Sequence, residues 1–139
     1  MNFKDIPIAQ LIPQRPPFVM VDRVVSCEAD TAETEFDITE DNIFLEGGHL
    51  QPAGIIENMA QSCAARMGCV NISHNEAIRI GVIGDIRDCC ILRFPSVRDK
   101  LTTHISILEE FFSLTLAEIT TKVGDEFVAT TRMKIALTE

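Results

Sequence analysis

The sequence predicts an α+β fold in which an antiparallel sheet wraps around one long helix. Three observations predict it: a central stretch has helical spacing of apolar residues, stretches of alternating apolar and polar residues flank it, and turn-forming residues separate these stretches. A single helix among antiparallel strands packs most simply when the sheet surrounds it. With 139 residues, the chain is expected to form one domain, residues 1–139.

The central helix is expected to begin at Pro52 and to stop at Gly68. Proline suits the first helical turn, where its missing N–H has no partner in the helix, and glycine is typical of a helix end. The helix is rich in small and apolar residues, so we expect it to be buried along much of its length. Residues on one side of it recur at steps of three and four: Ile55, Ile56, Met59, Cys63 and Met67.

The chain before this helix contains two strand-like stretches. We expect a short helix over residues 5–12, a strand over 18–25 that continues toward Cys27, a strand over 31–38, and a loop over 39–50. The second strand alternates, which puts four residues on one side: Ala32, Thr34, Phe36 and Ile38.

The chain after the helix reads as strands joined by turns. Residues 71–76 are polar and are expected to form a loop. A glycine near the middle of the next stretch indicates either one long strand or two strands broken near Gly84. Gly124 and the residue after it are a hairpin signal. The expected strands are 77–83, 86–94, 101–112, 114–123 and 127–137.

Composition excludes several function classes. A net charge of −9 argues against nucleic-acid binding, and no apolar run reaches the length of a membrane span. The first ten residues lack a cationic segment followed by an apolar core, so they do not form a secretory signal. The five cysteines lack the spacing of zinc ligands. We therefore expect a cytoplasmic protein with reduced thiols, no bound metal and no membrane contact.

The residues that can carry chemistry lie in and just before the central helix. Glu57 and Gln61 are one turn apart and share a face. A carboxylate on a buried helix is costly unless it is paired or takes part in catalysis, and burial would raise its pKa toward the working pH. The turn Gly47-Gly48 delivers His49 close to the helix N-terminus. The alternatives are a structural carboxylate and a loop imidazole bonded to a backbone carbonyl.

These stretches resemble a known family. The segment NIFLEGGH (42–49) followed by ENMAQ (57–61) resembles the hotdog-fold 3-hydroxyacyl-[acyl carrier protein] dehydratases, which have an Asn-x-x-Phe-x-x-Gly-His segment and a buried helix bearing Glu-x-x-Ala-Gln. LIPQRPPFVMVDRVV and CCILRFPSVRDKL resemble further segments of that family, so the resemblance runs over nearly the whole chain. The resemblance implies the hotdog fold.

This chain departs from the family pattern in two places. Only eight positions separate His49 from Glu57, whereas the family has a longer interval with Pro-Gly before the helix. Gln14 stands where the family's opening segment has histidine. The short form PAGIIENMAQ is closer to a divergent branch associated with aryl-polyene and flexirubin-type pigment pathways.

The resemblance implies an enzyme that removes water from a 3-hydroxyacyl thioester, without a cofactor, in fatty-acid or polyene biosynthesis. The implied substrate is linked to acyl carrier protein or coenzyme A. Glu57 and His49 would be the acid and base. The first N–H groups of the helix, at Gly54 and its neighbours, would polarise the thioester carbonyl, unless Gly54 only permits close packing. Gln61 would fix the carboxylate or satisfy a buried loop, and Asn58 would contact substrate or a partner subunit.

We also expect a homodimer or a higher even oligomer, because a second copy would cover the exposed sheet edge and enclose a dry tunnel for the acyl chain. His49 and Glu57 of opposite chains are then expected to converge on one tunnel. Because acyl carrier proteins are acidic, docking would need basic residues, and the candidates are Arg15, Arg93, Arg98 and Lys100. Two alternative functions remain open: a hotdog thioesterase, and a catalytically weakened acyl-binding subunit of a heterodimer.

Overall fold

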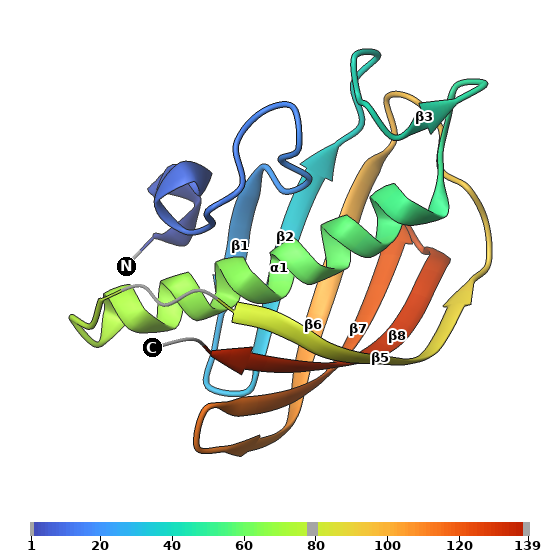
Figure 1. Cartoon of the computed structure of the whole chain (residues 1–139). Coiled ribbons are helices and arrows are strands. Elements are labelled where there is room, and N and C mark those ends of the chain that lie inside the picture. Colours follow the sequence, from blue (N-terminus) through green and yellow to red (C-terminus); the bar gives the residue numbers. More distant parts are fainter. Residues whose placement is uncertain (1, 78–80, 138–139) are drawn as a thin grey trace.

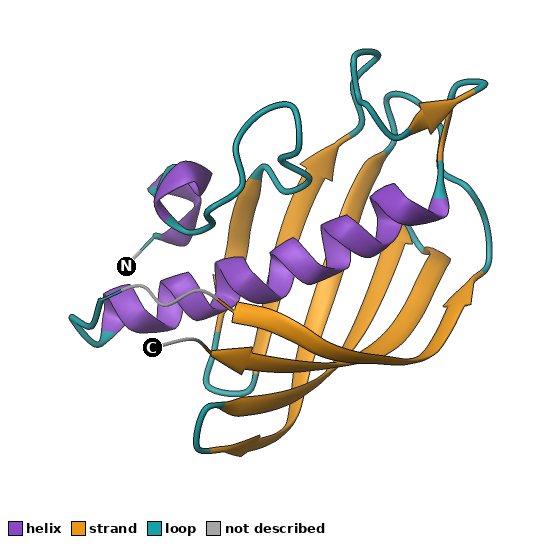
Figure 2. Ribbon diagram, viewed as in Figure 1, coloured by secondary structure: helices purple, strands orange, loops and turns teal. Residues whose placement is uncertain are grey.

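The computed structural model describes residues 2–77 and 81–137, and it confirms the hotdog arrangement. One long helix, α1, crosses the concave face of a curved antiparallel sheet (Figures 1 and 2). The strand order in this sheet is β1-β2-β6-β7-β8-β5, so β1 and β5 lie at its two edges. The elements are α1 (Pro52–Ser73), β1 (Arg23–Cys27), β2 (Thr31–Asp37), β5 (Gly81–Ile91), β6 (Lys100–Phe111), β7 (Leu114–Val123) and β8 (Glu126–Leu137).

The hydrophobic core lies between α1 and the sheet. The alternation expected in the second strand is confirmed, because Ala32, Thr34 and Phe36 of β2 are buried and their neighbours are less so. Ile55 and Met59 supply the helix side of the core and are fully buried. The face of α1 that the apolar spacing predicts is therefore the face that packs on the sheet.

The helix extends beyond the predicted stop at Gly68 and ends at Ser73. Gly68 is needed for close packing, because a Cβ there would lie 2.8 Å from the carbonyl oxygen of Leu11. The glycine thus lets the N-terminal segment approach the helix, and it does not end the helix. In the part of the chain that the structure describes, no helix is long and apolar enough to cross a membrane.

The short helix expected over residues 5–12 is wrong. Two 3₁₀ turns, η1 (Phe3–Asp5) and η2 (Ile8–Gln10), replace it. Ile6 and Pro7 between them are extended, with ψ of 119° and 135°. A residue before proline disfavours the helical region, so the chain breaks where a continuous helix would need Ile6 to be helical.

Two predicted strand boundaries also need correction. The first strand begins at Arg23 instead of residue 18, because the backbone of Phe18 and Met20 is hydrogen-bonded to side chains of α1 rather than to a neighbouring strand. Of the two alternatives for the stretch after the helix, the one long strand is confirmed, because β5 is continuous with a register shift at Gly84. This strand ends at Ile91 instead of residue 94. Of the strand expected over 77–83, residues 78–80 lie outside the described residues.

The segment expected as a loop over 39–50 contains a small hairpin of β3 (Leu45–Glu46) and β4 (His49–Leu50). Gly47 and Gly48 form its two-residue turn with φ of 60° and 79°. Two positive φ values are what such a turn needs, and glycine adopts them without strain. The Gly-Gly pair was therefore a hairpin signal, and it fixes the position of His49.

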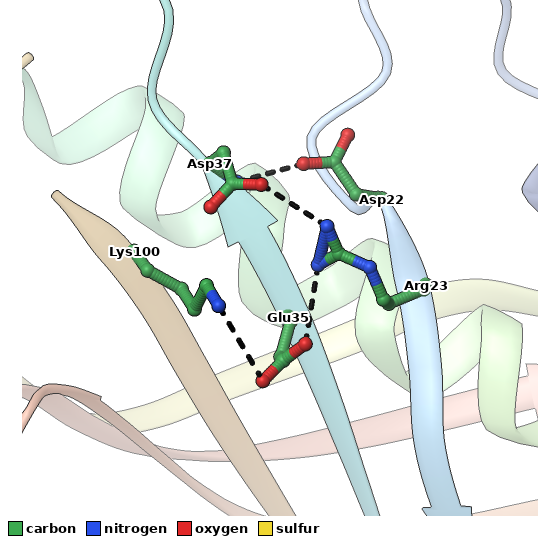
Figure 3. A network of polar contacts seen from close by, with 5 residues as sticks. All are labelled: Asp22, Arg23, Glu35, Asp37 and Lys100. Carbon is green, nitrogen blue, oxygen red and sulfur yellow. Dashed lines mark hydrogen bonds and ion pairs between the residues drawn. The ribbon is translucent and has the colours of Figure 1, made fainter. Parts of the chain in front are cut away.

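Acidic and basic side chains meet on the polar face of β1, β2 and β6 (Figure 3). Arg23 bridges Glu35 at 3.1 Å and Asp37 at 3.0 Å, and Lys100 lies 4.0 Å from Glu35. Asp22 accepts a bond from the amide of Asp37 at 2.7 Å. Exposed ion pairs contribute little to stability individually, and this network joins three neighbouring strands on their polar face.

Candidate functional site

Glu57 lies in the second turn of α1 and is partly buried. Its Oε2 accepts a hydrogen bond of 2.9 Å from Nε2 of Gln61, one turn further along the helix. The shared face expected for these two residues is therefore confirmed. Among the described residues, no hydrogen bond occupies the other carboxylate oxygen, and an acid or base that works on a substrate requires such an oxygen.

Gln61 also joins the helix to the segment that precedes β1. Its Oε1 accepts from the amide of Met20 at 2.6 Å, and its Nε2 donates to the carbonyl of Phe18 at 2.8 Å. Both roles considered for Gln61 are thus met at once: it holds the Glu57 carboxylate, and it satisfies a buried loop. The orientation of Glu57 is in this way coupled to the position of the Phe18–Met20 backbone.

Asn58 has its side chain inside the protomer. It is fully buried, donates to the carbonyl of Met20 at 2.7 Å and accepts from Oγ1 of Thr103 at 2.6 Å. Thr103 in turn lies 2.8 Å from Oγ1 of Thr121 on the next strand. The expected contact of Asn58 with a partner subunit does not fit this burial. A role in substrate binding stays a prediction, and the observed contacts link α1 to the sheet.

Gly54 supports close packing more directly than carbonyl binding. A Cβ at this position would lie 2.6 Å from Cβ of Phe44 and 2.7 Å from a methyl group of Leu50. The Gly54 amide is occupied, because it donates to the carbonyl of Gln51 at 2.9 Å. Among the described residues, no backbone carbonyl accepts from the amide of the preceding residue, Ala53, which is exposed. A free N–H at the helix start is therefore available at Ala53, not at Gly54.

His49 is exposed in the protomer and lies on β4, just before the helix. Its Nδ1 lies 3.3 Å from Oγ of Ser96, and the two residues also form a backbone bridge. The hairpin is fixed further by the Leu50 amide, which donates to the carbonyl of Pro95 at 2.7 Å. No hydrogen bond joins His49 to Glu57 of the same chain within the described residues. The expected convergence across two chains stays a prediction.

A narrow apolar hollow, partly open to solvent, begins one turn beyond Glu57. Ala60 and Ala64 form its helix side, and isoleucines of the sheet face them. Cys63 also lines the hollow, and burial raises the pKa of its thiol to about 12. The Cys63 side chain therefore stays protonated and contributes an apolar surface rather than a nucleophile.

The basic residues considered for carrier docking all have partners within the chain. The guanidinium of Arg15 donates to the carbonyls of Ala9, Ile12 and Gln14. The other three form ion pairs: Arg93 with Asp99 and Glu126, Arg98 with Glu40, and Lys100 with Glu35. Over residues 2–77 and 81–137, no three His, Cys, Asp or Glu side chains gather as a metal site would require.

The sequence reasoning missed two residues near this site. Ser96 is the neighbour of the His49 ring, and only the turn after Pro95 hinted at its place. Arg66 lies on α1 and is 3% exposed at the far end of the apolar hollow. Its signal was an arginine within a helix expected to be buried, where a charge is costly without partners.

Comparisons with known proteins identify the family of this chain. The family model of ApeP-like proteins, described as ApeP dehydratase, matches residues 6–136. A 3-hydroxyacyl-[acyl-carrier-protein] dehydratase FabZ of Thermoanaerobacter pseudethanolicus is 28% identical over 145 residues and covers 100% of this chain and 99% of its own.

Two solved structures show the same fold. One is the dehydratase heterocomplex ApeI:P from Xenorhabdus doucetiae, with a TM-score of 0.89 and 18% identity over 96% of this chain and 92% of that chain. The other is a hypothetical thioesterase with coenzyme A from Streptococcus pneumoniae, with a TM-score of 0.67 and 9% identity over 83% and 84%. Because the family model spans nearly all of the sequence, the chain belongs to the ApeP-like dehydratase family.

Proposed function

We propose that the protein removes water from 3-hydroxyacyl thioesters of an acyl carrier protein and forms trans-2-enoyl thioesters. The observation that carries this proposal is the Glu57 carboxylate, which Gln61 holds at 2.9 Å beside an apolar hollow in a member of a dehydratase family. The curated relatives, whose names specify 3-hydroxyacyl-[acyl-carrier-protein] dehydratases, support the substrate class.

The reaction needs two proton transfers. A base removes a proton from C2 of the acyl chain, an acid gives a proton to the C3 hydroxyl, the C3–O bond breaks, and water leaves as the C2=C3 double bond forms. We assign these transfers to Glu57 and His49, since a carboxylate and an imidazole can each accept and donate a proton. The amide of Ala53, an exposed residue at the helix N-terminus, would bind the thioester oxygen as charge develops there.

A partner chain is part of this proposal. Strand β5 is an edge strand, and it exposes Val82 and Ile86, whose exposed fractions are 51% and 40%. An exposed apolar edge is normally covered in a native protein. We propose that a second chain pairs with β5 and brings its own His49 or an equivalent group to Glu57. The similarity to a subunit of a dehydratase heterocomplex supports a related subunit as the alternative second chain.

The decisive experiment incubates the pure protein with a 3-hydroxyacyl carrier protein and, separately, with a saturated acyl thioester. Mass spectrometry of the carrier detects loss of one water, and a thiol reagent detects hydrolysis. Formation of an enoyl carrier protein supports the proposal. Release of free thiol would favour the thioesterase reading instead. Neither product from the isolated chain would indicate that activity needs a different partner subunit.

The oligomeric state is measured independently by light scattering coupled to size exclusion. A mass of two protomers supports a homodimer. A stable monomer would contradict the homodimer and would favour a heterodimeric assembly, in which the missing chain completes the site.

A further inference from the structure

The apolar hollow beyond Glu57 has small side chains on its helix side and larger apolar side chains on its sheet side. Two small residues, Ala60 and Ala64, leave the space free along the helix. Its floor is made by branched side chains of the sheet, Ile83, Ile105, Ile107 and Ile135. An extended alkyl chain matches such a surface, because burying apolar area from water is favourable on both sides.

The helix residues that line the hollow lie on the same face of α1 as Glu57. Glu57, Ala60, Ala64 and Met67 follow one another at steps of three and four, so they form one stripe along α1. A thioester whose reacting carbons lie at Glu57 would therefore send its acyl chain along this stripe toward the C-terminal half of the helix.

Arg66 closes the far end of the hollow. One of its terminal nitrogens lies 3.2 Å from a carboxylate oxygen of Glu110 and 3.3 Å from the carbonyl oxygen of Ala29. Its Nε is buried and has no acceptor among the described residues. The Glu110 side chain is 47% exposed, so the ion pair that holds the guanidinium lies partly in solvent.

A second groove lies on the other side of this arginine. It is partly open to solvent, and Cys27, Val70 and His74 contribute to its walls. Arg66 and Met67 line both the groove and the apolar hollow, so these two side chains separate the two spaces.

We propose that Arg66 is a specificity-determining residue that sets the longest acyl chain the enzyme accepts. The inference rests on the proposed function, because it assumes an acyl thioester at Glu57. An alkyl chain that ends before Arg66 meets only apolar walls. A longer chain would press apolar carbons against the guanidinium and push it away from Glu110 and the carbonyl of Ala29, which is unfavourable for a buried charge that loses its partners. The nine residues from Glu57 to Arg66 span roughly 13.5 Å along the helix axis, and this length is the limit.

The test measures kcat/KM for 3-hydroxyacyl carrier proteins whose chains increase in steps of two carbons. For the wild-type protein, kcat/KM is expected to fall by about tenfold or more once the chain reaches Arg66, as for a buried donor left without a partner. Arg66→Ala joins the hollow to the groove, so the fall is expected to move to longer chains while short chains keep their rate. An unchanged length profile for Arg66→Ala would overturn the proposal.

Two further variants keep the test informative if Arg66→Ala folds poorly. Glu110→Gln leaves the arginine in place but removes its ion pair, and it should shift the profile in the same direction by a smaller amount. Arg132→Ala is the matched control, because Arg132 also pairs with a half-exposed glutamate, Glu118 at 3.5 Å, but on the outside of the sheet. Its length profile should match that of the wild-type protein. A shift with the control as large as with Arg66→Ala would contradict a local role.

Measurements of acyl-chain binding distinguish the length limit set by Arg66 from the proposed dehydration. Saturated acyl carrier proteins of the same lengths cannot lose water, and their affinity is measured by calorimetry. If no variant forms enoyl product but Arg66→Ala still extends the bound length, the dehydration proposal fails and the length limit holds. If turnover is normal but neither rate nor affinity shifts with Arg66→Ala, the length limit fails alone.

Discussion

Nε2 of Gln61 lies 2.9 Å from Oε2 of Glu57, and the same amide group holds the backbone of Phe18 and Met20. One side chain thus fixes the carboxylate and the segment that covers it. A change at Gln61 therefore affects both stability and the geometry of the site.

Gln61→Ala is expected to lower the free energy of unfolding by about 1–3 kcal/mol, because the amide of Met20 and the carbonyl of Phe18 lose their partners in a buried place. Denaturant unfolding measures this loss. Gln10→Ala, at an exposed position, is the control and should change stability by less than about 0.5 kcal/mol. Equal effects of the two substitutions would show that the bonds of Gln61 contribute little.

Gly54→Ala tests the packing of the helix start against the hairpin. A Cβ there would overlap Phe44 and Leu50, and overpacking of this kind typically costs about 1–3 kcal/mol. Gly84→Ala is the matched control, since its Cβ would meet only the Lys134 carbonyl at an ordinary 3.8 Å. Thermal unfolding should separate the two variants. Equal stability would mean that the hairpin moves aside without cost.

Asp22 makes stability depend on pH. Burial is the main cause that raises the pKa of this carboxyl above its ordinary 3.8, and the amide of Asp37 and the charge of Arg23 oppose the rise only in part. The folded state then binds the proton more tightly than the unfolded state, so the contribution of Asp22 to stability falls as pH rises from 3.8 to the raised value. The side chain in Asp22→Asn cannot ionise, so the stability of this variant does not fall with pH for this reason.

The expected result is that Asp22→Asn gains in stability relative to the wild-type protein between acidic and neutral pH. Urea unfolding at pH 3 and at pH 7 measures the difference. A difference that moves the other way would mean that the bond from the Asp37 amide stabilises the ionised carboxylate more than burial disfavours it.

The cross-subunit site predicts complementation between two inactive variants. If His49 and Glu57 of opposite chains form each site, a dimer of His49→Ala with Glu57→Gln contains one intact site and one doubly altered site. Random exchange in a two-fold dimer makes half of the dimers mixed, so activity should recover to about a quarter of the wild-type level. No recovery after subunit exchange would mean that both residues act within one chain or that His49 is not needed.

Much of the fold could be predicted from local patterns, because each of these patterns depends only on residues that are close together in the sequence. The alternation in β2 and the helical spacing from Ile55 to Met67 gave the correct elements and faces. The remaining features of the fold depend on contacts between segments that are far apart in the sequence. In the sequence, Gly68 indicates a helix end, but in the structure Leu11 packs against it and the helix continues. The valine-rich residues after Phe18 indicate a strand, but Asn58 and Gln61 form hydrogen bonds with the backbone there.

The candidate site was predictable only in part for the same reason. The face shared by Glu57 and Gln61 follows from a spacing of one turn. The neighbour of His49, Ser96, is 47 positions away in the chain, and its place depends on how the hairpin meets the loop after β5. Arg66 was missed because its role depends on a hollow that only the packed sheet creates.

The central claim is that Glu57 carries the dehydration, and Glu57→Gln tests it most directly. The substitution keeps the shape of the side chain but removes the titrating group. Enoyl formation from a 3-hydroxyacyl carrier protein is measured in a single turnover, with circular dichroism to verify the fold and Glu76→Gln, at an exposed position, as the control. The account predicts that Glu57→Gln loses at least about a hundredfold in rate while the control keeps its activity. Near-normal turnover by a folded Glu57→Gln protein would contradict it.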